Sequence, residues 1–113
     1  MQRTVEQVAR DHLAAVASGD VEAMASDYAE TAVLDRAGDL HQGKRAIEAY
    51  FRSVPDRLGQ AVVVFDGLDI EGETATFQWH LEGGATEVSG TDVCLIKGNA
   101  IVHQRVHLNA TDF

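Results

Sequence analysis

The stretch TVEQVARDHLAAVASGD, residues 4–20, predicts an amphipathic helix that carries a polar residue inside its apolar face. At 3.6 residues per turn, one side of this helix collects the apolar positions Val5, Val8, Ala9, Leu13 and Val16. His12 projects within that stripe, so it points into the protein if the helix packs at all. A buried imidazole that is left unpaired costs about 1–3 kcal/mol. His12 is therefore either a core histidine with its hydrogen bonds satisfied or a polar group aimed into a cavity.

The rest of the N-terminal half predicts two more helices and one short strand. Asp20 can cap a second helix over about residues 21–28, after a glycine that ends the first. An apolar segment over residues 32–36 predicts a brief strand, and a loop follows it. Residues 44–54 predict a third helix, and we expect Pro55 to end it because proline lacks the backbone N–H.

The C-terminal half changes to the two-residue period of strands. Residues 74–82 alternate apolar and polar side chains, which is typical of a half-buried strand. Further strands are predicted over residues 61–65, 87–97 and 100–109. Three helices followed by an antiparallel meander of long strands predict an α+β fold.

The two faces of the predicted sheet differ in polarity. The face under the helices is expected to carry Phe77, Trp79, Leu81, Asp92, Val102, Gln104, Val106 and Leu108. The other face is expected to carry Val93, Leu95, Ile101, His103, Arg105 and His107. Because such a half-apolar face is a typical contact surface, the sequence favours a homodimer through this outer face.

Length and charge fit one globular domain over residues 1–113. Nine basic residues against eighteen acidic ones give a net charge of −9, which argues against binding to nucleic acid or to an anionic membrane surface. The N-terminus has no apolar signal segment, and no apolar run approaches the ~20 residues that span a bilayer. We therefore expect a cytoplasmic protein with no nucleic-acid or membrane partner.

The histidines and the single cysteine form no metal-binding pattern in the sequence. His103 and His107 lie four residues apart, which in a strand is roughly 13 Å and too far for one ion. With no Cys/His cluster elsewhere in the sequence, we expect no metal ion. Cys94 has no neighbours typical of a nucleophile, so we expect a small buried residue there.

Three stretches of the chain carry a resemblance to a known family: HLAAVASGDVEAMASDYAETAVLDRAG (12–38), GKRAIEAYF (43–51) and TDVCLIKGNAIVHQRVHL (91–108). Together they resemble the NTF2-like superfamily, and more narrowly its ketosteroid-isomerase-like and SnoaL-like members. The resemblance implies a cone, in which a curved antiparallel sheet wraps round a pocket that three N-terminal helices close. It also implies a dimer through the outer sheet face. This fold hosts isomerases, cyclases, dehydratases, hydrolases and non-catalytic binding modules.

The resemblance also implies three catalytic residues. Asp35 stands where the isomerases carry a catalytic carboxylate, at the end of the short strand. Asp92 matches a second carboxylic acid early in the penultimate long strand, and His12 stands where the isomerases carry a tyrosine. Asp35 would then act as the general base, while His12 and Asp92 stabilise the oxyanion.

Aromatic and polar side chains are expected to complete the pocket. The candidate ligand-binding residues are Tyr28, Tyr50, Phe51, Phe65, Phe77, Trp79, Gln104 and Leu108, although the same side chains would fill any core. Two functions remain open. One is a cofactor-independent isomerase or lyase that transfers a proton on an apolar carbonyl-containing small molecule. The alternative is a non-catalytic ligand-binding or dimerisation module of the same fold.

Overall fold

The first helix lies where the sequence predicts it. The computed structural model of the protein describes residues 3–36, 38–84 and 87–108. Helix α1 (Val5–Ser18) begins after Thr4, whose side chain accepts a hydrogen bond from a backbone N–H of the first turn at 3.1 Å. The helix ends at Gly19, whose φ of 75° lies in the left-handed region that glycine tolerates.

The other two helices differ from the prediction at their C-terminal ends. Helix α2 (Val21–Ser26) is capped by Asp20 as expected, but it stops earlier because Tyr28 already begins a strand. Helix α3 (Lys44–Leu58) continues past Pro55, so the prediction that Pro55 ends it is wrong. A proline removes only one N–H, and the chain continues for a further turn. None of the helices in the described ranges combines the length and apolar character that crossing a bilayer requires.

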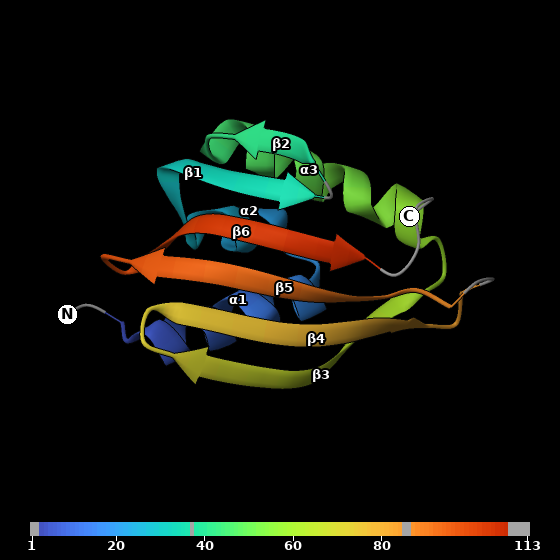
Figure 1. Cartoon of the computed structure of the whole chain (residues 1–113). Coiled ribbons are helices and arrows are strands. Elements are labelled where there is room, and N and C mark those ends of the chain that lie inside the picture. Colours follow the sequence, from blue (N-terminus) through green and yellow to red (C-terminus); the bar gives the residue numbers. More distant parts are fainter. Residues whose placement is uncertain (1–2, 37, 85–86, 109–113) are drawn as a thin grey trace.

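Six strands in the described part of the chain form one sheet, which confirms the α+β prediction (Figure 1). They are β1 (Tyr28–Arg36), β2 (Asp39–Gln42), β3 (Val62–Glu71), β4 (Thr74–Glu82), β5 (Ser89–Lys97) and β6 (Ala100–Leu108). Their order in the sheet is β2-β1-β6-β5-β4-β3. The sheet is mixed rather than wholly antiparallel, because β1 pairs with β6 in parallel. The strand β2 lies where the sequence predicted a loop.

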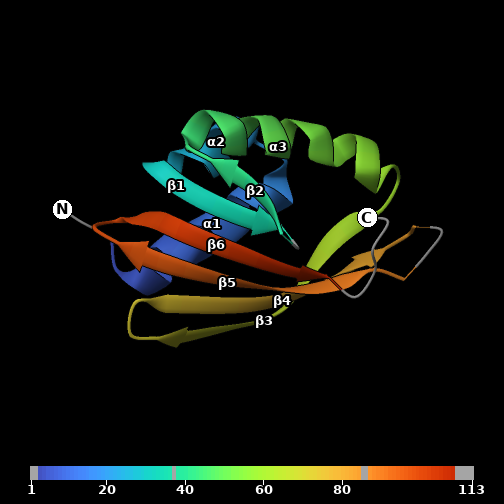
Figure 2. The same ribbon diagram turned by 45° about the horizontal axis from the view of Figure 1, so that its top comes forward.

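All three helices cover one face of this curved sheet (Figure 2). Helix α1 packs on β3, β4 and β5, and helix α3 lies along β1 and β2. Between the two layers lies the core, in which the largest fully buried side chains include Tyr28, Leu34, Ile47, Ile96 and Ile101. Within residues 3–36, 38–84 and 87–108, no helix lies on the opposite face of the sheet (Figure 1).

A β-bulge changes which side chains of β6 face the core. Leu95 pairs with His103 but Ile96 pairs with Ile101, so Val102 is one extra residue in β6. The alternation therefore shifts by one, and Ile101 is buried at 1% exposure. The prediction that Ile101 lies on the outer face is wrong for this reason. Beyond the bulge, Gln104 and Val106 face the core as predicted.

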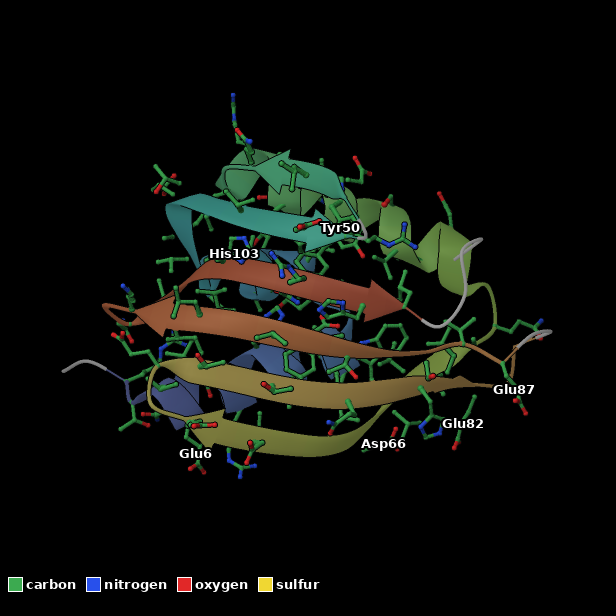
Figure 3. All side chains as sticks on the ribbon, viewed as in Figure 1. Glu6, Tyr50, Asp66, Glu82, Glu87 and His103 are labelled. Atoms are coloured by element: carbon green, nitrogen blue, oxygen red, sulfur yellow. The ribbon has the colours of Figure 1, made fainter. Side chains whose placement is uncertain are left out.

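The outer face of the sheet is partly apolar, as predicted. A shallow groove there is lined by Thr74, Val93, Leu95, His103, Arg105 and His107. Figure 3 shows His103 on this face of β6. We propose that a second copy of the chain covers this groove, because the half-buried apolar side chains lie at the centre of the sheet and not at its edge.

Substitution of the groove centre tests this dimer. Val93→Lys places a positive charge in the middle of the proposed contact, beside Arg105, and should shift the protein to monomer, because the groove lining offers it no carboxylate and an unpaired buried charge is costly. Sedimentation equilibrium at tens of micromolar protein measures the mass of the wild type and the variant. Ala49→Lys introduces the same charge at an exposed position of α3 and should leave the dimer intact. A wild-type protein that sediments as a monomer contradicts the proposal.

Candidate functional site

A cavity of about 140 Å³ lies between the helices and the sheet. It is lined by His12, Val16, Gly19, Val21, Met24, Leu34, Tyr50, Phe51, Val54, Pro55, Val63, Phe65, Phe77, Trp79, Asp92, Gln104, Val106 and Leu108. Pro55 is exposed and Val54 and Val63 are half-buried, so the cavity opens near the C-terminal end of α3. Its volume is close to that of an apolar cavity that holds a single benzene ring, about 150 Å³.

Most of the residues that the sequence singled out come together here. All the predicted ligand-binding residues except Tyr28 line the cavity, together with His12 and Asp92. Tyr28 is buried at 1% exposure, within reach of both His12 and Gln104. The lining follows from alternation along the strands and from the apolar stripe of α1. Binding of a ligand by these side chains stays a prediction.

The polar end of the cavity is built round Asp92. Trp79 Nε1 donates to its Oδ1 at 2.8 Å, and Gln104 Nε2 donates to its Oδ2 at 2.6 Å. The Asp92 side chain itself is 7% exposed. Burial raises the pKa of the Asp92 carboxyl above its usual value, and the hydrogen bonds from Trp79 and Gln104 offset this only in part. Asp92 is thus a carboxyl that takes up a proton more readily than an exposed aspartate.

Gln104 continues the hydrogen-bond chain away from Asp92. Because its amide nitrogen donates to Asp92, its carbonyl oxygen is free to accept, and the Tyr28 hydroxyl donates to it. Nε2 of His12 lies 3.4 Å from the Tyr28 oxygen. Burial raises the pKa of Tyr28 well above its usual value, so the hydroxyl keeps its proton at neutral pH.

The chain of polar contacts ends on Asp27 and Arg3, two residues that sequence reasoning missed. Asp27 Oδ2 lies 3.5 Å from His12 Nδ1, and Arg3 Nη1 lies 2.9 Å from Asp27 Oδ1. Burial opposes the charge on Asp27, but His12 and Arg3 together outweigh it and lower the pKa of the Asp27 carboxyl. No short-range motif marks these residues, since Arg3 and Asp27 are 24 positions apart. The one available signal was an aspartate placed next to a tyrosine in a predicted core.

Asp35 is not among the residues that line the cavity, although the resemblance implied that it acts there as the general base. In β1, Leu34 pairs with Gln104 and faces the cavity, so the next side chain faces the outer side. Asp35 pairs there with Arg105, whose Nε is 3.8 Å from Asp35 Oδ2. The other Asp35 oxygen accepts the Gly38 N–H at 2.8 Å. The alternation of a strand thus makes Asp35 a turn and surface residue.

Titratable side chains also lie outside the cavity, and the part of the chain that the structure describes groups none of them into a metal site. In the described ranges, no group of three or more histidine, cysteine, aspartate or glutamate side chains is arranged to hold a metal ion. His80 bridges Asp66 and Glu82, with each nitrogen 2.8 Å from a carboxylate oxygen, and Figure 3 shows both acids at the same end of the sheet. Asp66 and then Glu82 raise the pKa of His80. Cys94 is buried, as expected.

The arrangement of the helices and the sheet is what the chain shares with known proteins. Residues 9–104 match the SnoaL-like domain. The match spans most of the sequence, and the chain belongs to the SnoaL-like domain family. No curated protein matches the sequence significantly.

Solved structures share the fold at low sequence identity. An NTF2-like protein of unknown function from Burkholderia pseudomallei has a TM-score of 0.81 at 15% identity, over 93% of this chain and 90% of that one. A candidate polyketide cyclase from Sinorhizobium meliloti has a TM-score of 0.78 at 20% identity, over 88% of this chain and 93% of that one. A candidate SnoaL-like isomerase from Agrobacterium tumefaciens has a TM-score of 0.75 at 22% identity, over 91% of this chain and 95% of that one. These similarities confirm the predicted NTF2-like fold.

Gly90 controls the position of the Trp79 indole. The two residues pair across β5 and β4, and a Cβ on Gly90 would lie 2.5 Å from Trp79 Cζ2 and 2.9 Å from the His107 carbonyl oxygen. Gly90→Ala should therefore displace the indole, disturb its bond to Asp92 and cost about 1–3 kcal/mol of unfolding free energy. Urea unfolding followed by the fluorescence of Trp79, the single tryptophan, measures this.

Gly67→Ala is the matched control for Gly90→Ala. Its Cβ would meet only the Gln78 Oε1, at 3.0 Å, and that exposed side chain can move aside. The control should cost less than Gly90→Ala. Equal losses in the two variants would contradict the assigned role of Gly90.

Asp92 should also make the stability of the protein fall as pH rises. A carboxyl whose pKa is raised on folding stabilises the protein fully below its unfolded pKa of about 4, and this contribution is lost as pH rises through the folded pKa. The free energy of unfolding of Asp92→Asn, minus that of the wild type, should therefore increase as pH rises above about 4, as measured by urea unfolding. The pKa of Asp27 is lowered on folding, so the stability that this carboxyl contributes is present above its unfolded pKa of about 4 and is lost as pH falls below it. The wild type should therefore lose stability relative to Asp27→Asn as pH falls below about 4. Parallel curves for wild type and Asp92→Asn would contradict the assignment.

Proposed function

We propose that the chain is a proton-transfer enzyme of the isomerase or lyase type, acting on an apolar, carbonyl-containing small molecule. One observation carries the proposal. Asp92 is the one carboxylate among the described residues that line the cavity, and its pKa is raised there by burial. A base whose pKa lies closer to neutral pH than an ordinary aspartate is well matched to proton abstraction.

The proposed step uses Asp92 as base and His12 as donor. Asp92 removes the proton from the carbon beside the carbonyl, and the electrons of that C–H bond move to the carbonyl oxygen. His12 donates an N–H to the resulting enolate oxygen, which is stabilised more in an apolar cavity than in water. In a substrate that also carries a carbon–carbon double bond between its β- and γ-carbons, Asp92 then returns the proton to the γ-carbon, so that this double bond moves to the α,β-position and no other reactant is consumed.

The walls of the cavity indicate the kind of substrate. Phe51, Phe65, Phe77 and Trp79 line it, and aromatic faces favour contact with flat apolar rings. The volume fits about one ring, so we expect a larger substrate to extend through the mouth near Pro55. Two of the solved neighbours are named as a candidate polyketide cyclase and a candidate isomerase, and these names support a reaction of the isomerase type for this chain.

One observation favours the alternative, a ligand-binding module without turnover. Each oxygen of Asp92 already accepts a hydrogen bond, from Trp79 and from Gln104. A carboxylate held in this way also serves a purely structural purpose in a buried network. The same cavity would then bind an apolar ligand and leave it unchanged.

Exchange of the α-protons of cyclohexanone in D₂O, followed by proton NMR, separates the two functions. The ring fits the cavity, and exchange reports proton removal whatever the natural product is. The wild type should accelerate exchange, and Asp92→Asn should lower the enzymatic rate by at least ~10²-fold, the usual scale for loss of a general base. Asp35→Asn should retain the full rate, because Asp35 faces the outer side of the sheet.

Each other outcome has a defined meaning. If cyclohexanone raises the melting temperature of the wild type without any exchange above buffer, the alternative function is supported. If Asp92→Asn exchanges as fast as the wild type while remaining folded, the proposed role of Asp92 is wrong. If Asp35→Asn loses activity, the assignment of the base to the cavity is wrong.

A further inference from the structure

One ring nitrogen of His12, Nδ1, has no hydrogen-bond partner among the described residues. Its side chain is 2% exposed, and Nε2 faces the Tyr28 oxygen. Nδ1 is buried and has no good hydrogen bond among the described residues. The charged atom nearest to it is Asp27 Oδ2 at 3.5 Å. A buried N–H or lone pair without a partner is costly, so the orientation of this ring depends on Asp27.

Asp27 is itself fixed in place from outside the cavity. It is 3% exposed, and Arg3 Nη1 holds its other oxygen at 2.9 Å. Arg3 is tied in turn to Asn99, since its backbone N–H and its Nε both donate to Asn99 Oδ1 at 3.0 Å. Asp27 also accepts the backbone N–H of Ile101 through its carbonyl oxygen at 2.8 Å. The carboxylate is therefore anchored between the N-terminal residue Arg3 and the turn that joins β5 to β6.

The direction of the hydrogen bonds decides which proton Asp27 accepts. The single proton of the Tyr28 hydroxyl goes to Gln104, so toward His12 the Tyr28 oxygen can only accept. Nε2 of His12 therefore presents an N–H toward Tyr28 and the cavity. An ionised carboxylate only accepts, so Nδ1 must present an N–H toward Asp27. Such a pair of donors makes a charged ring, for which a buried carboxylate is the expected partner.

We infer that Asp27, held by Arg3, is a positioning residue that keeps a proton on Nδ1 of His12 and thereby turns Nε2–H toward the substrate. The inference rests on the proposed function, in which His12 donates to the enolate oxygen. Asp27 does not line the cavity, so it acts only through His12. A carboxylate that orients an imidazole in this way is a general device of acid–base catalysis.

Nitrogen-15 NMR of the histidine side chains tests the inference without any substrate. Long-range proton–nitrogen correlations distinguish a protonated from an unprotonated ring nitrogen, and His12→Gln identifies the His12 signals by their loss. In the wild type at neutral pH, Nδ1 should be protonated. In Asp27→Asn, the amide oxygen stays with Arg3 and the NH₂ group faces Nδ1, so Nδ1 should lose its proton.

The control is Asp11→Asn, because Asp11 is the other carboxylate that Arg3 contacts, at 3.0 Å, and its side chain is exposed while the His12 ring faces Asp27. This variant should leave the His12 signals unchanged. A folded Asp27→Asn with the wild-type nitrogen pattern would overturn the inference. If Asp27→Asn fails to fold, the wild type alone decides, because an unprotonated Nδ1 there also overturns it.

Kinetics separate this inference from the proposed function. Asp27→Asn should lower kcat for cyclohexanone exchange by about tenfold, through loss of a charge-assisted donor, with little change in KM. Absence of exchange in the wild type would refute the proposed function, while the NMR result on Nδ1 still stands. A change in KM alone would overturn the positioning role, since that pattern indicates loss of uniform binding.

Discussion

The site depends on one constraint, which is that every buried polar atom between the helices and the sheet needs a partner. Gln104 is the residue that makes this possible at the sheet surface. An amide both donates and accepts, so Gln104 can donate to Asp92 and accept from Tyr28 at the same time. Replacing it by an apolar side chain would leave one donor and one acceptor unpaired in the interior, at a cost of about 1–3 kcal/mol each.

This hydrogen-bond chain also gives the cavity its polar lining. The carboxyl of Asp92 and the imidazole of His12 line it together with Gln104, while aromatic and aliphatic side chains make up most of the remaining wall. The pKa values of the two buried aspartates of this network are shifted in opposite directions, since burial raises the pKa of Asp92 and the groups beside Asp27, His12 and Arg3, lower its pKa. Asp92 therefore takes up a proton more readily than Asp27, which stays ionised beside His12.

Much of this arrangement can be predicted from the sequence, because simple periods set it. The stripe of α1 points His12 inward, and strand alternation places Asp92 and Gln104 on the same face. Periodicity does not predict a β-bulge within a strand, nor an ion pair between residues far apart in the sequence. The extra residue Val102 moves Ile101 into the core, and no pattern announces such a bulge.

Asp35 lies outside the cavity for a similar reason. Asp35 directly follows Leu34, which lines the cavity. Because side chains alternate along a strand, Asp35 faces the other side of the sheet. Arg3 and Asp27 could not be paired in advance, since only the folded chain brings the residue before the N-cap of α1 next to the C-cap of α2. The sequence therefore predicts the cavity and its central polar groups, while the support behind His12 requires the structure.

The most direct test of the account is a crystal structure of the protein with phenol, a stable planar analogue of the enol of cyclohexanone. The account predicts that the phenol oxygen lies within hydrogen-bonding distance of Asp92 or His12, with the ring against Phe77 and Trp79. Phenol bound only in the groove on the outer face of the sheet, with the cavity empty of it, would contradict the account.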